Sequence, residues 1–286
     1  MNSFFKAVVL AFALKLLLAA ILFVSKGALA ESTVQNKGYA KHKNAQSFIQ
    51  TMVVKHGFDR DYVEQLLAKA EKKPAILEAI ARPAEKVKPW YEYRNIFLKP
   101  KRIDDGVTFW REHEVLLTKV AKEMGVPAHI IVAIIGVETR YGTYMGPYRV
   151  IDALTTLGFD YPKRSHFFTR QLEEFLLLTR EQKQNPLALK GSYAGAMGYG
   201  QFIPSSYRSF AVDFDDDGFA DIWNNKQDAI ASVANYFKAH GWQTGKPIAE
   251  PAVKDARFPN KLFNTSARPK IAVSELAALG LTALSL

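Results

Sequence analysis

The most constraining feature of this 286-residue chain is an almost uninterrupted apolar segment near its middle, residues 129–137, which read HIIVAIIGV. Pro127 precedes it at a position typical of the first turn of a helix. A helix that is apolar on nearly every side must be surrounded by other elements of the fold. We therefore expect a mainly α protein in which further helices pack around this segment.

Glu138 ends this apolar segment. At helical spacing it shares a face with Ile131, Ile134 and Ile135, and the last turn of a helix disfavours an anion. Both effects favour the neutral acid and predict a raised pKa for Glu138. A carboxyl group kept protonated near neutral pH is what general-acid cleavage of a glycosidic bond requires. The alternative is a Glu side chain that emerges into solvent, paired with Arg140.

The rest of the chain is also predominantly helical in pattern. Asp59 is expected to cap the second of the early helices. Residues 86–101 hold two prolines and four aromatic side chains and predict an irregular connection. After Gly241, prolines interrupt the pattern, and 271–273 reads as a short strand. We expect helices over 47–56, 61–70, 75–82, 104–124, 151–157, 164–182, 205–211 and 228–240.

The first thirty residues predict a secretory signal peptide. Lys15 is followed by an apolar stretch over 16–24, and Ala28-Leu29-Ala30 supplies a cleavage site after Ala30. The alternative is an uncleaved anchor in the inner membrane, although Lys15 leaves the run short of the ~20 apolar residues that a span needs. We expect a periplasmic protein.

The composition and net charge limit the kinds of site, anchor and partner that this chain can have. The chain has no cysteine, which excludes disulfides, thiolate zinc sites, a cysteine nucleophile and a lipid anchor through Cys. Its formal charge of +10 suits an anionic partner: nucleic acid, acidic lipid or an anionic cell-wall polymer. Export disfavours nucleic acid among these three.

A glycine-rich segment over 191–204 reads GSYAGAMGYGQFIP. Its glycines match neither the dinucleotide fingerprint nor the P-loop, so no organic cofactor is expected. Small residues with Ser192, Gln201 and two tyrosines predict backbone brought close to a flat polar ligand such as a sugar. The alternative is a tight crossing of helices that requires glycine.

An acidic segment follows. Asp213, Asp215 and Asp217 occupy positions 1, 3 and 5 of a loop with Gly218 at position 6, the spacing of an EF-hand calcium loop. The Phe219 carbonyl would supply a further oxygen. Position 12 is Asn224 instead of a bidentate Glu, so Asp228 or Asp221 would have to close the shell. The sequence predicts a structural Ca²⁺ site.

Together these segments resemble the membrane-bound lytic murein transglycosylase B family. The resemblance rests on Val137-Glu138-Thr139-Arg140-Tyr141-Gly142, on 194–207 (AGAMGYGQFIPSSY), and on the acidic loop with 228–237 (DAIASVANYF). It implies an α+β fold with a goose-lysozyme-like helical core over 126–242. A helical lobe over 31–125 and a small β-containing lobe over 243–286 would flank this core.

The resemblance also implies an activity. Such enzymes cleave the β-1,4 bond from N-acetylmuramic acid to N-acetylglucosamine in peptidoglycan strands and leave a 1,6-anhydromuramoyl end. Glu138 would be the single catalytic carboxylate, and other cell-wall enzymes would be partners. The resemblance places Tyr93, Arg164, Ser192, Gln201 and Tyr236 at substrate-contacting positions, and Asp213, Asp215, Asp217, Phe219 and Asp228 at the calcium. Core packing is the alternative for Tyr236, and a solvated charge is the alternative for Arg164.

The chain departs from the family in two respects. It lacks the N-terminal Cys that often carries a lipid. Family members also continue beyond the segment over 273–281, so we expect the β lobe to be incomplete relative to the family. Two alternative functions follow: a hydrolytic muramidase that uses water, or a non-catalytic peptidoglycan-binding protein if the shortened lobe disables the cleft.

Overall fold

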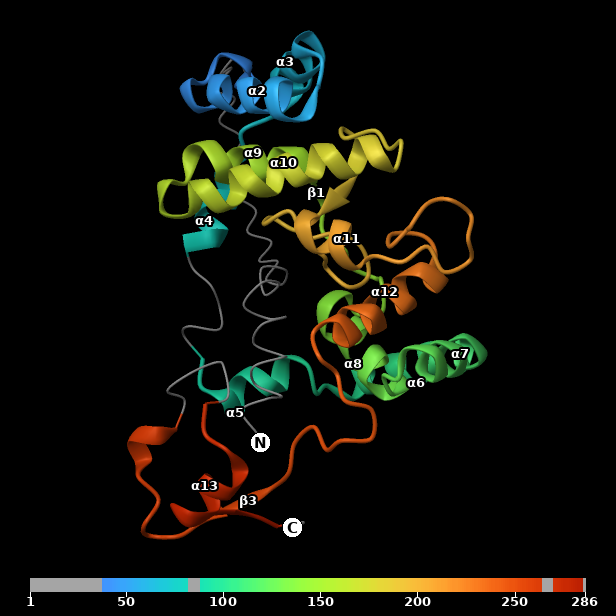
Figure 1. Ribbon diagram of the computed structural model, residues 1–286, viewed down its shortest axis with the longest axis vertical. Helices are drawn as coiled ribbons and strands as arrows, with labels where there is room; N and C mark the ends of the chain where they lie inside the picture. Colours follow the sequence, from blue (N-terminus) through green and yellow to red (C-terminus); the bar gives the residue numbers. More distant parts are fainter. Residues whose placement is uncertain (1–37, 82–87, 264–269, 285–286) are drawn as a thin grey trace. The chain divides into compact units, whose positions relative to one another are not determined.

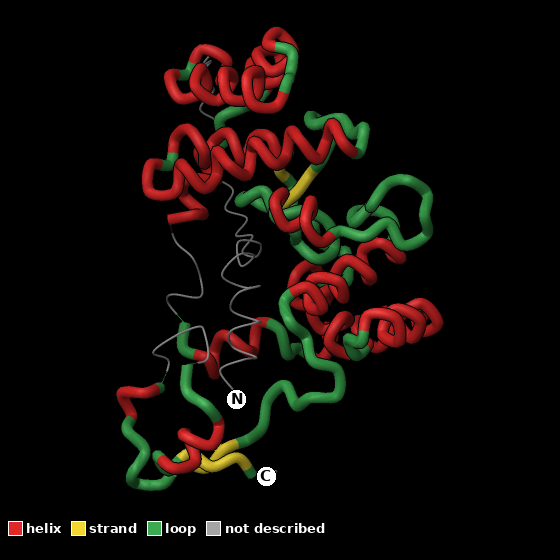
Figure 2. Tube along the Cα trace, in the orientation of Figure 1, coloured by secondary structure: helices red, strands yellow, loops and turns green. Residues whose placement is uncertain are grey.

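The computed structural model describes residues 38–81, 88–263 and 270–284. They form two compact units, a larger one that ends at Trp242 and a smaller one that begins at Gln243. The larger unit is built of helices joined by loops (Figures 1 and 2). The predicted signal peptide, 1–30, lies outside the described residues.

The mainly α architecture predicted from the sequence is confirmed. The α-helices of the larger unit are α2 (Lys43–His56), α3 (Arg60–Lys69), α4 (Pro74–Ala81), α5 (Trp90–Tyr93), α6 (Pro100–Glu112), α7 (Glu114–Met124), α8 (Ala128–Thr139), α9 (Val150–Asp160), α10 (Ser165–Glu181), α11 (Pro204–Phe210) and α12 (Lys226–Ala239). Its 3₁₀ turns are η1 (Tyr39–Lys41), η3 (Arg94–Ile96) and η4 (Pro162–Arg164).

The apolar segment forms α8, which lies in the core as expected. Ile131 and Ile135 are fully buried on it, and α6, α7 and α12 all pack against it. A left-handed Gly125 ends α7 before Pro127 leads into α8. The helices packed around α8 hold its last turn, where Glu138 lies, in position.

A second core lies between α9 and the first helices. Helix α10 packs along α9, and α4 also contacts α9 (Figure 1). Asp152 of α9 is buried, accepts two hydrogen bonds from the Arg149 guanidinium and accepts a third from the Glu71 backbone N–H. The Asp152 contacts join α9 to the segment between α3 and α4. The N-terminus of α3 is capped by Asp59 through the Tyr62 N–H, as predicted.

Each unit contains one small antiparallel sheet. In the larger unit β1 (Tyr148–Arg149) pairs with β2 (Lys190–Gly191), which connects the segment after α8 to the start of the glycine-rich loop. The smaller unit comprises β3 (Ala252–Lys254), η5 (Asn260–Leu262), α13 (Val273–Ala278) and β4 (Leu281–Ala283). Its strands pair with Val253 opposite Thr282.

Two predictions about secondary structure are wrong. The helix expected over 104–124 begins at Pro100 and is broken at His113, whose backbone leaves the helical region. The His113 ring packs edge-on at 4.6 Å against Phe109, one turn earlier in the chain, and no glycine or proline marks the break. The strand expected over 271–273 is replaced by the start of α13, where the Ala272 N–H donates to the Glu275 carboxylate.

Within the described ranges, no single helix is both long and apolar enough to span a membrane. Helices α7 and α8 meet that criterion only when they are taken together, and they are bent by 113° at the break between them.

Candidate active site

Glu138 lies in the last turn of α8 and is 9% exposed. Among the described residues its carboxyl group has no hydrogen-bond or ion-pair partner, so the alternative of a solvent-facing Glu paired with Arg140 is wrong. Burial raises the pKa of Glu138 well above its ordinary value. The structure thus confirms the neutral-acid environment predicted from the apolar helix.

The chain turns sharply after Glu138. Arg140, Tyr141 and Gly142 all have positive φ, at 51°, 59° and 84°. Such a run ends the helix abruptly. The Thr139 hydroxyl lies 3.1 Å from the Tyr199 carbonyl oxygen and accepts from the Gly142 N–H at 3.0 Å. The end of α8 is therefore tied directly to the glycine-rich loop.

That loop is folded upon itself around Ser192. The Ser192 hydroxyl oxygen accepts from the N–H groups of Ala194 and Ala196, and the side chain is buried. A Cβ at Gly191 would lie 2.3 Å from the Ala196 carbonyl oxygen. Gly191 thus permits close approach of two backbone segments within the loop itself, and the alternative of a tight crossing of helices stays a prediction.

Gln201 is the most unusual residue of the loop. It is fully buried and holds a left-handed backbone with φ of 50°. Its amide nitrogen donates to the carbonyl oxygens of Met145 and Gly198. Its Oε1 atom is buried and has no hydrogen-bond partner in the part of the chain that the structure describes. An unmatched acceptor of this kind can accept from a ligand N–H or O–H.

The two predicted aromatic contacts differ in their connection to the site: packing joins Tyr236 to the glycine-rich loop, whereas Tyr93 packs against Phe97. Tyr236 is buried, stacks on His240 at 4.0 Å and meets Phe202 of the loop edge-on. This is the core packing foreseen as its alternative role. Tyr93 of α5 is half-buried and meets Phe97 edge-on at 5.3 Å. For both tyrosines, substrate contact stays a prediction.

Arg164 is not connected to the site by any contact within the described residues. It ends η4, is exposed, and places its guanidinium over the rings of Phe167 at 4.2 Å and Phe168 at 5.2 Å. Its predicted role in substrate binding stays a prediction.

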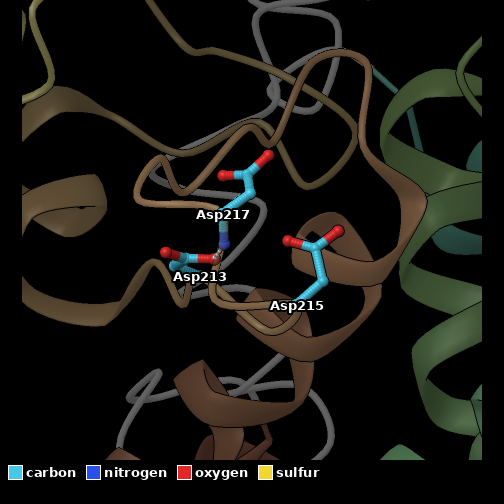
Figure 3. A group of neighbouring side chains, drawn as sticks. All are labelled: Asp213, Asp215 and Asp217. Atoms are coloured by element: carbon cyan, nitrogen blue, oxygen red, sulfur yellow. Dashed lines mark hydrogen bonds between the residues drawn. The ribbon is translucent and has the colours of Figure 1, made fainter.

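The acidic loop between α11 and α12 gathers three carboxylates. Asp213, Asp215 and Asp217 each present an oxygen within 4.8 Å of the others (Figure 3). None of them pairs with a basic side chain in the described ranges. Asp213 accepts from the N–H groups of Asp217 and Gly218, which gives the loop its tight curvature. Three converging carboxylates fit the oxygen ligands that Ca²⁺ prefers.

The other predicted ligands have protein partners. Asp228 is fully buried, and its two oxygens accept from the N–H groups of Phe214 and Asp221, so it holds the two sides of the loop together. The Phe219 carbonyl accepts from the Asp221 N–H. The Asp221 carboxylate caps the following turn at Trp223. Asp228 lies outside the cluster of three carboxylates, and its place among the ligands stays a prediction.

Comparison with known proteins assigns the family. The pattern of the transglycosylase SLT domain matches residues 40–285. The membrane-bound lytic murein transglycosylase B of Escherichia coli is 47% identical over 253 residues, which cover 85% of this chain and 69% of that protein. The chain belongs to the transglycosylase SLT domain family. It is accordingly an enzyme, a lytic transglycosylase.

Solved structures agree with this lytic transglycosylase fold. The catenated lytic transglycosylase SltB1 of Pseudomonas aeruginosa is 49% identical, with a TM-score of 0.83 over 86% of this chain and 81% of that one. The lytic transglycosylase Slt35 of E. coli in complex with calcium is 44% identical, with a TM-score of 0.77 over 90% of this chain and 81% of that one. The predicted lysozyme-like fold is confirmed.

Sequence reasoning missed two contributors to this site. Met145 supplies the carbonyl that holds the Gln201 amide, and nothing in its residue type signals this role. Tyr141 packs its ring against Phe109 of α6. Its position three residues after Glu138 was a signal that could have been followed, because a large ring beside a helix end must pack against a neighbouring element.

Proposed function

We propose that this lytic transglycosylase cleaves the β-1,4 bond between N-acetylmuramic acid and N-acetylglucosamine in peptidoglycan strands, with Glu138 as its single acid and base. The observation that best supports this proposal is the environment of Glu138. Its carboxyl group is buried, has no partner among the described residues, and has a raised pKa that favours its neutral form. A second carboxylate with such properties is absent from the described segments around it. This arrangement differs from the usual pair of carboxylates in glycoside hydrolases.

The proposed reaction uses one proton twice. Glu138 donates its proton to the bridging oxygen as the bond from C1 of the muramic acid to that oxygen breaks, and the N-acetylglucosamine leaves with a free 4-hydroxyl group. The Glu138 carboxylate then accepts the proton of the C6 hydroxyl as its oxygen bonds to C1. The product carries a 1,6-anhydro ring, water is not consumed, and Glu138 ends protonated.

The neighbouring residues would hold the sugar for this reaction. The free Oε1 of Gln201 is available to accept from an N-acetyl N–H or a sugar hydroxyl. Ser192, whose oxygen already accepts two backbone bonds, retains its hydroxyl proton for donation. Tyr93 would provide an aromatic face, and Tyr236 would support the loop through Phe202. Arg164 is retained as a more distant contact for the peptide or sugar.

Mass spectrometry of a murein digest tests this proposal. We expect soluble fragments that end in 1,6-anhydromuramic acid and are lighter by one water than hydrolytic products. Reducing muramic acid ends would instead indicate a muramidase. Binding to murein without release of any soluble fragment would indicate a non-catalytic binding protein.

We further propose that the acidic loop binds Ca²⁺ through Asp213, Asp215 and Asp217, with the Phe219 carbonyl and Asp228 as additional ligands. The repulsion between three converging carboxylates supports this, because a divalent cation would remove it. Bound there, the ion would cross-link the loop next to α12. Its role is structural, since Glu138 needs no metal for the steps above.

Removal of calcium is expected to destabilise the enzyme. A chelator should lower the melting temperature by several degrees and added Ca²⁺ should restore it, because a ligand that binds only the folded state stabilises it. The measurement is thermal unfolding followed by circular dichroism. Asp213→Asn should abolish the calcium response, whereas Asp61→Asn, on the exposed surface of α3, should leave it intact. An unchanged melting temperature under both treatments would contradict the site.

We also propose that the enzyme works in the periplasm, where peptidoglycan is accessible, after removal of residues 1–30. Retention in the inner membrane by an uncleaved N-terminus is the alternative. The E. coli relative is named as membrane-bound, which fits a place in the cell envelope. The intact mass of the exported protein distinguishes cleavage after Ala30 from retention.

A further inference from the structure

Two guanidinium groups at the carboxyl end of α8 have no carboxylate to neutralise them. Arg102 lies in the first turns of α6, and Arg140 follows Glu138 by two residues; neither forms an ion pair within the described residues. Asp105, one turn beyond Arg102, pairs with Lys101 at 2.7 Å instead. The two arginines therefore remain available for an anionic ligand.

Arg102 also carries an unmatched hydrogen-bond donor. Its Nη1 atom is buried and has no hydrogen-bond partner in the segments that the structure describes, while its guanidinium carbon lies 5.3 Å from the centre of the Phe97 ring. Leaving a buried donor of a charged group unpaired is unfavourable. A ligand that accepts a hydrogen bond at this point would relieve the penalty.

Tyr141 brings the two arginines together. Its hydroxyl donates to the Arg102 carbonyl oxygen at 3.1 Å. A Cβ at either Gly106 of α6 or Gly136 of α8 would lie 2.4 Å from that hydroxyl, so the ring fills the crossing of the two helices. Burial lowers the pKa of Arg102, and the nearby charge of Arg140 lowers it further. The backbone of Arg102 is held against Tyr141, the residue that directly follows Arg140.

Phe97 connects Arg102 to Tyr93, the aromatic residue proposed to bind sugar. Phe97, under the Arg102 guanidinium, meets Tyr93 edge-on. Arg140 directly follows α8 as its C-cap, two residues after Glu138. A carboxylate held by this pair would therefore lie near the end of α8 that carries Glu138.

We propose that Arg102 and Arg140 bind a carboxylate of the peptidoglycan substrate and thereby position the muramic acid residue at Glu138. A planar guanidinium recognises a carboxylate through charge-assisted hydrogen bonds. The carboxylate could come from the stem peptide or, where the peptide is missing, from the lactyl group of muramic acid. This inference rests on the proposed function, because it takes peptidoglycan as the substrate.

Binding to the full chain carrying Glu138→Gln tests the proposal without cleavage. The ligands are an N-acetylglucosamine–N-acetylmuramic acid fragment with its pentapeptide, and the same fragment with its carboxylates converted to methylamides. Arg102→Gln and Arg140→Asn should each weaken binding of the charged fragment roughly tenfold or more, and change binding of the neutral one by less than about twofold. Asn suits the left-handed backbone at position 140.

Arg111→Gln is the matched control, because it removes a guanidinium from the same helix at an exposed position that forms no ion pair within the described residues. It should leave both affinities unchanged. Equal weakening of both fragments by the arginine variants, or no weakening at all, would overturn the proposal. Unchanged melting temperatures show that the variants are folded.

A third ligand identifies the source of the carboxylate. With the peptide removed, the fragment ends in the free lactyl carboxylate. If its binding still depends on the arginines, the lactyl group is the source of the carboxylate. If the dependence on the arginines disappears, the stem peptide is the source. The products of the murein digest test the proposed reaction independently of these binding measurements. Charge-dependent binding without anhydro ends would overturn the proposed reaction and leave the carboxylate site standing.

Discussion

Glu138→Gln is expected to abolish release of anhydromuropeptides, with a fall in turnover of about a thousandfold or more. Glutamine fills the same space but cannot donate a proton to the bridging oxygen, and general-acid catalysis alone contributes roughly 10² to 10⁴ in rate. In this reaction Glu138 also serves as the base, so both steps are lost. The measurement is the initial rate at which soluble fragments appear from purified murein.

The substitution should not unfold the protein. Because Glu138 is buried without a partner among the described residues, a neutral amide is tolerated there at least as well as the acid. Glu123→Gln, at an exposed position in the last turns of α7, is the matched control and should retain full activity. A Glu138→Gln variant that keeps more than about a tenth of the wild-type rate would exclude Glu138 as the acid.

The pH dependence of stability should reveal the same group. The folded-state pKa of Glu138 is raised above its unfolded value of about 4.3. Between these two values the folded protein binds more protons than the unfolded one, so the contribution of Glu138 to stability falls as pH rises through this window. Because catalysis requires protonated Glu138, the rate of murein cleavage should also fall as pH rises through this window. In Glu138→Gln this contribution to the pH dependence of unfolding should disappear.

Gly198→Ala is expected to destabilise the enzyme by about 3 kcal/mol or more and to reduce its activity about a hundredfold. Gly198 has φ of 65°, and an added Cβ would lie 2.4 Å from the Ile222 carbonyl oxygen. The left-handed backbone costs a non-glycine residue roughly 1 kcal/mol, and overpacking against backbone adds about 1–3 kcal/mol. The Gly198 carbonyl accepts from Gln201, so displacement of Gly198 also moves Gln201. Urea unfolding and the murein assay measure the two effects.

Gly57→Ala separates backbone strain from the clash. Gly57 also has φ of 65°, but nothing lies within 4 Å of a Cβ built there. It ends α2, away from the glycine-rich loop. We expect a loss of only about 1 kcal/mol and no change in turnover. Equal effects of the two substitutions would mean that the approach of Gly198 to Ile222 does not limit the loop.

The local sequence pattern by itself determined several features of the site. An apolar helix that ends in a carboxylate predicted both the burial of Glu138 and the direction of its pKa shift, because helical spacing alone places isoleucines on its face. The spacing of Asp213, Asp215 and Asp217 predicted that their carboxylates converge, since they belong to a single short loop. Asp59 was recognisable as a cap for the same reason: its partner, the Tyr62 N–H, is three residues away.

The tertiary structure alone decided which distant groups meet. Arg102 meets Tyr141, the neighbour of Arg140, because the Tyr141 ring fills the crossing of α6 and α8, and no periodicity in the sequence encodes that crossing. Gln201 is left with an unmatched Oε1 because Met145 and Gly198 take its amide nitrogen. Residue type and spacing thus specify local environments, whereas contacts between segments far apart in the chain depend on how whole helices pack.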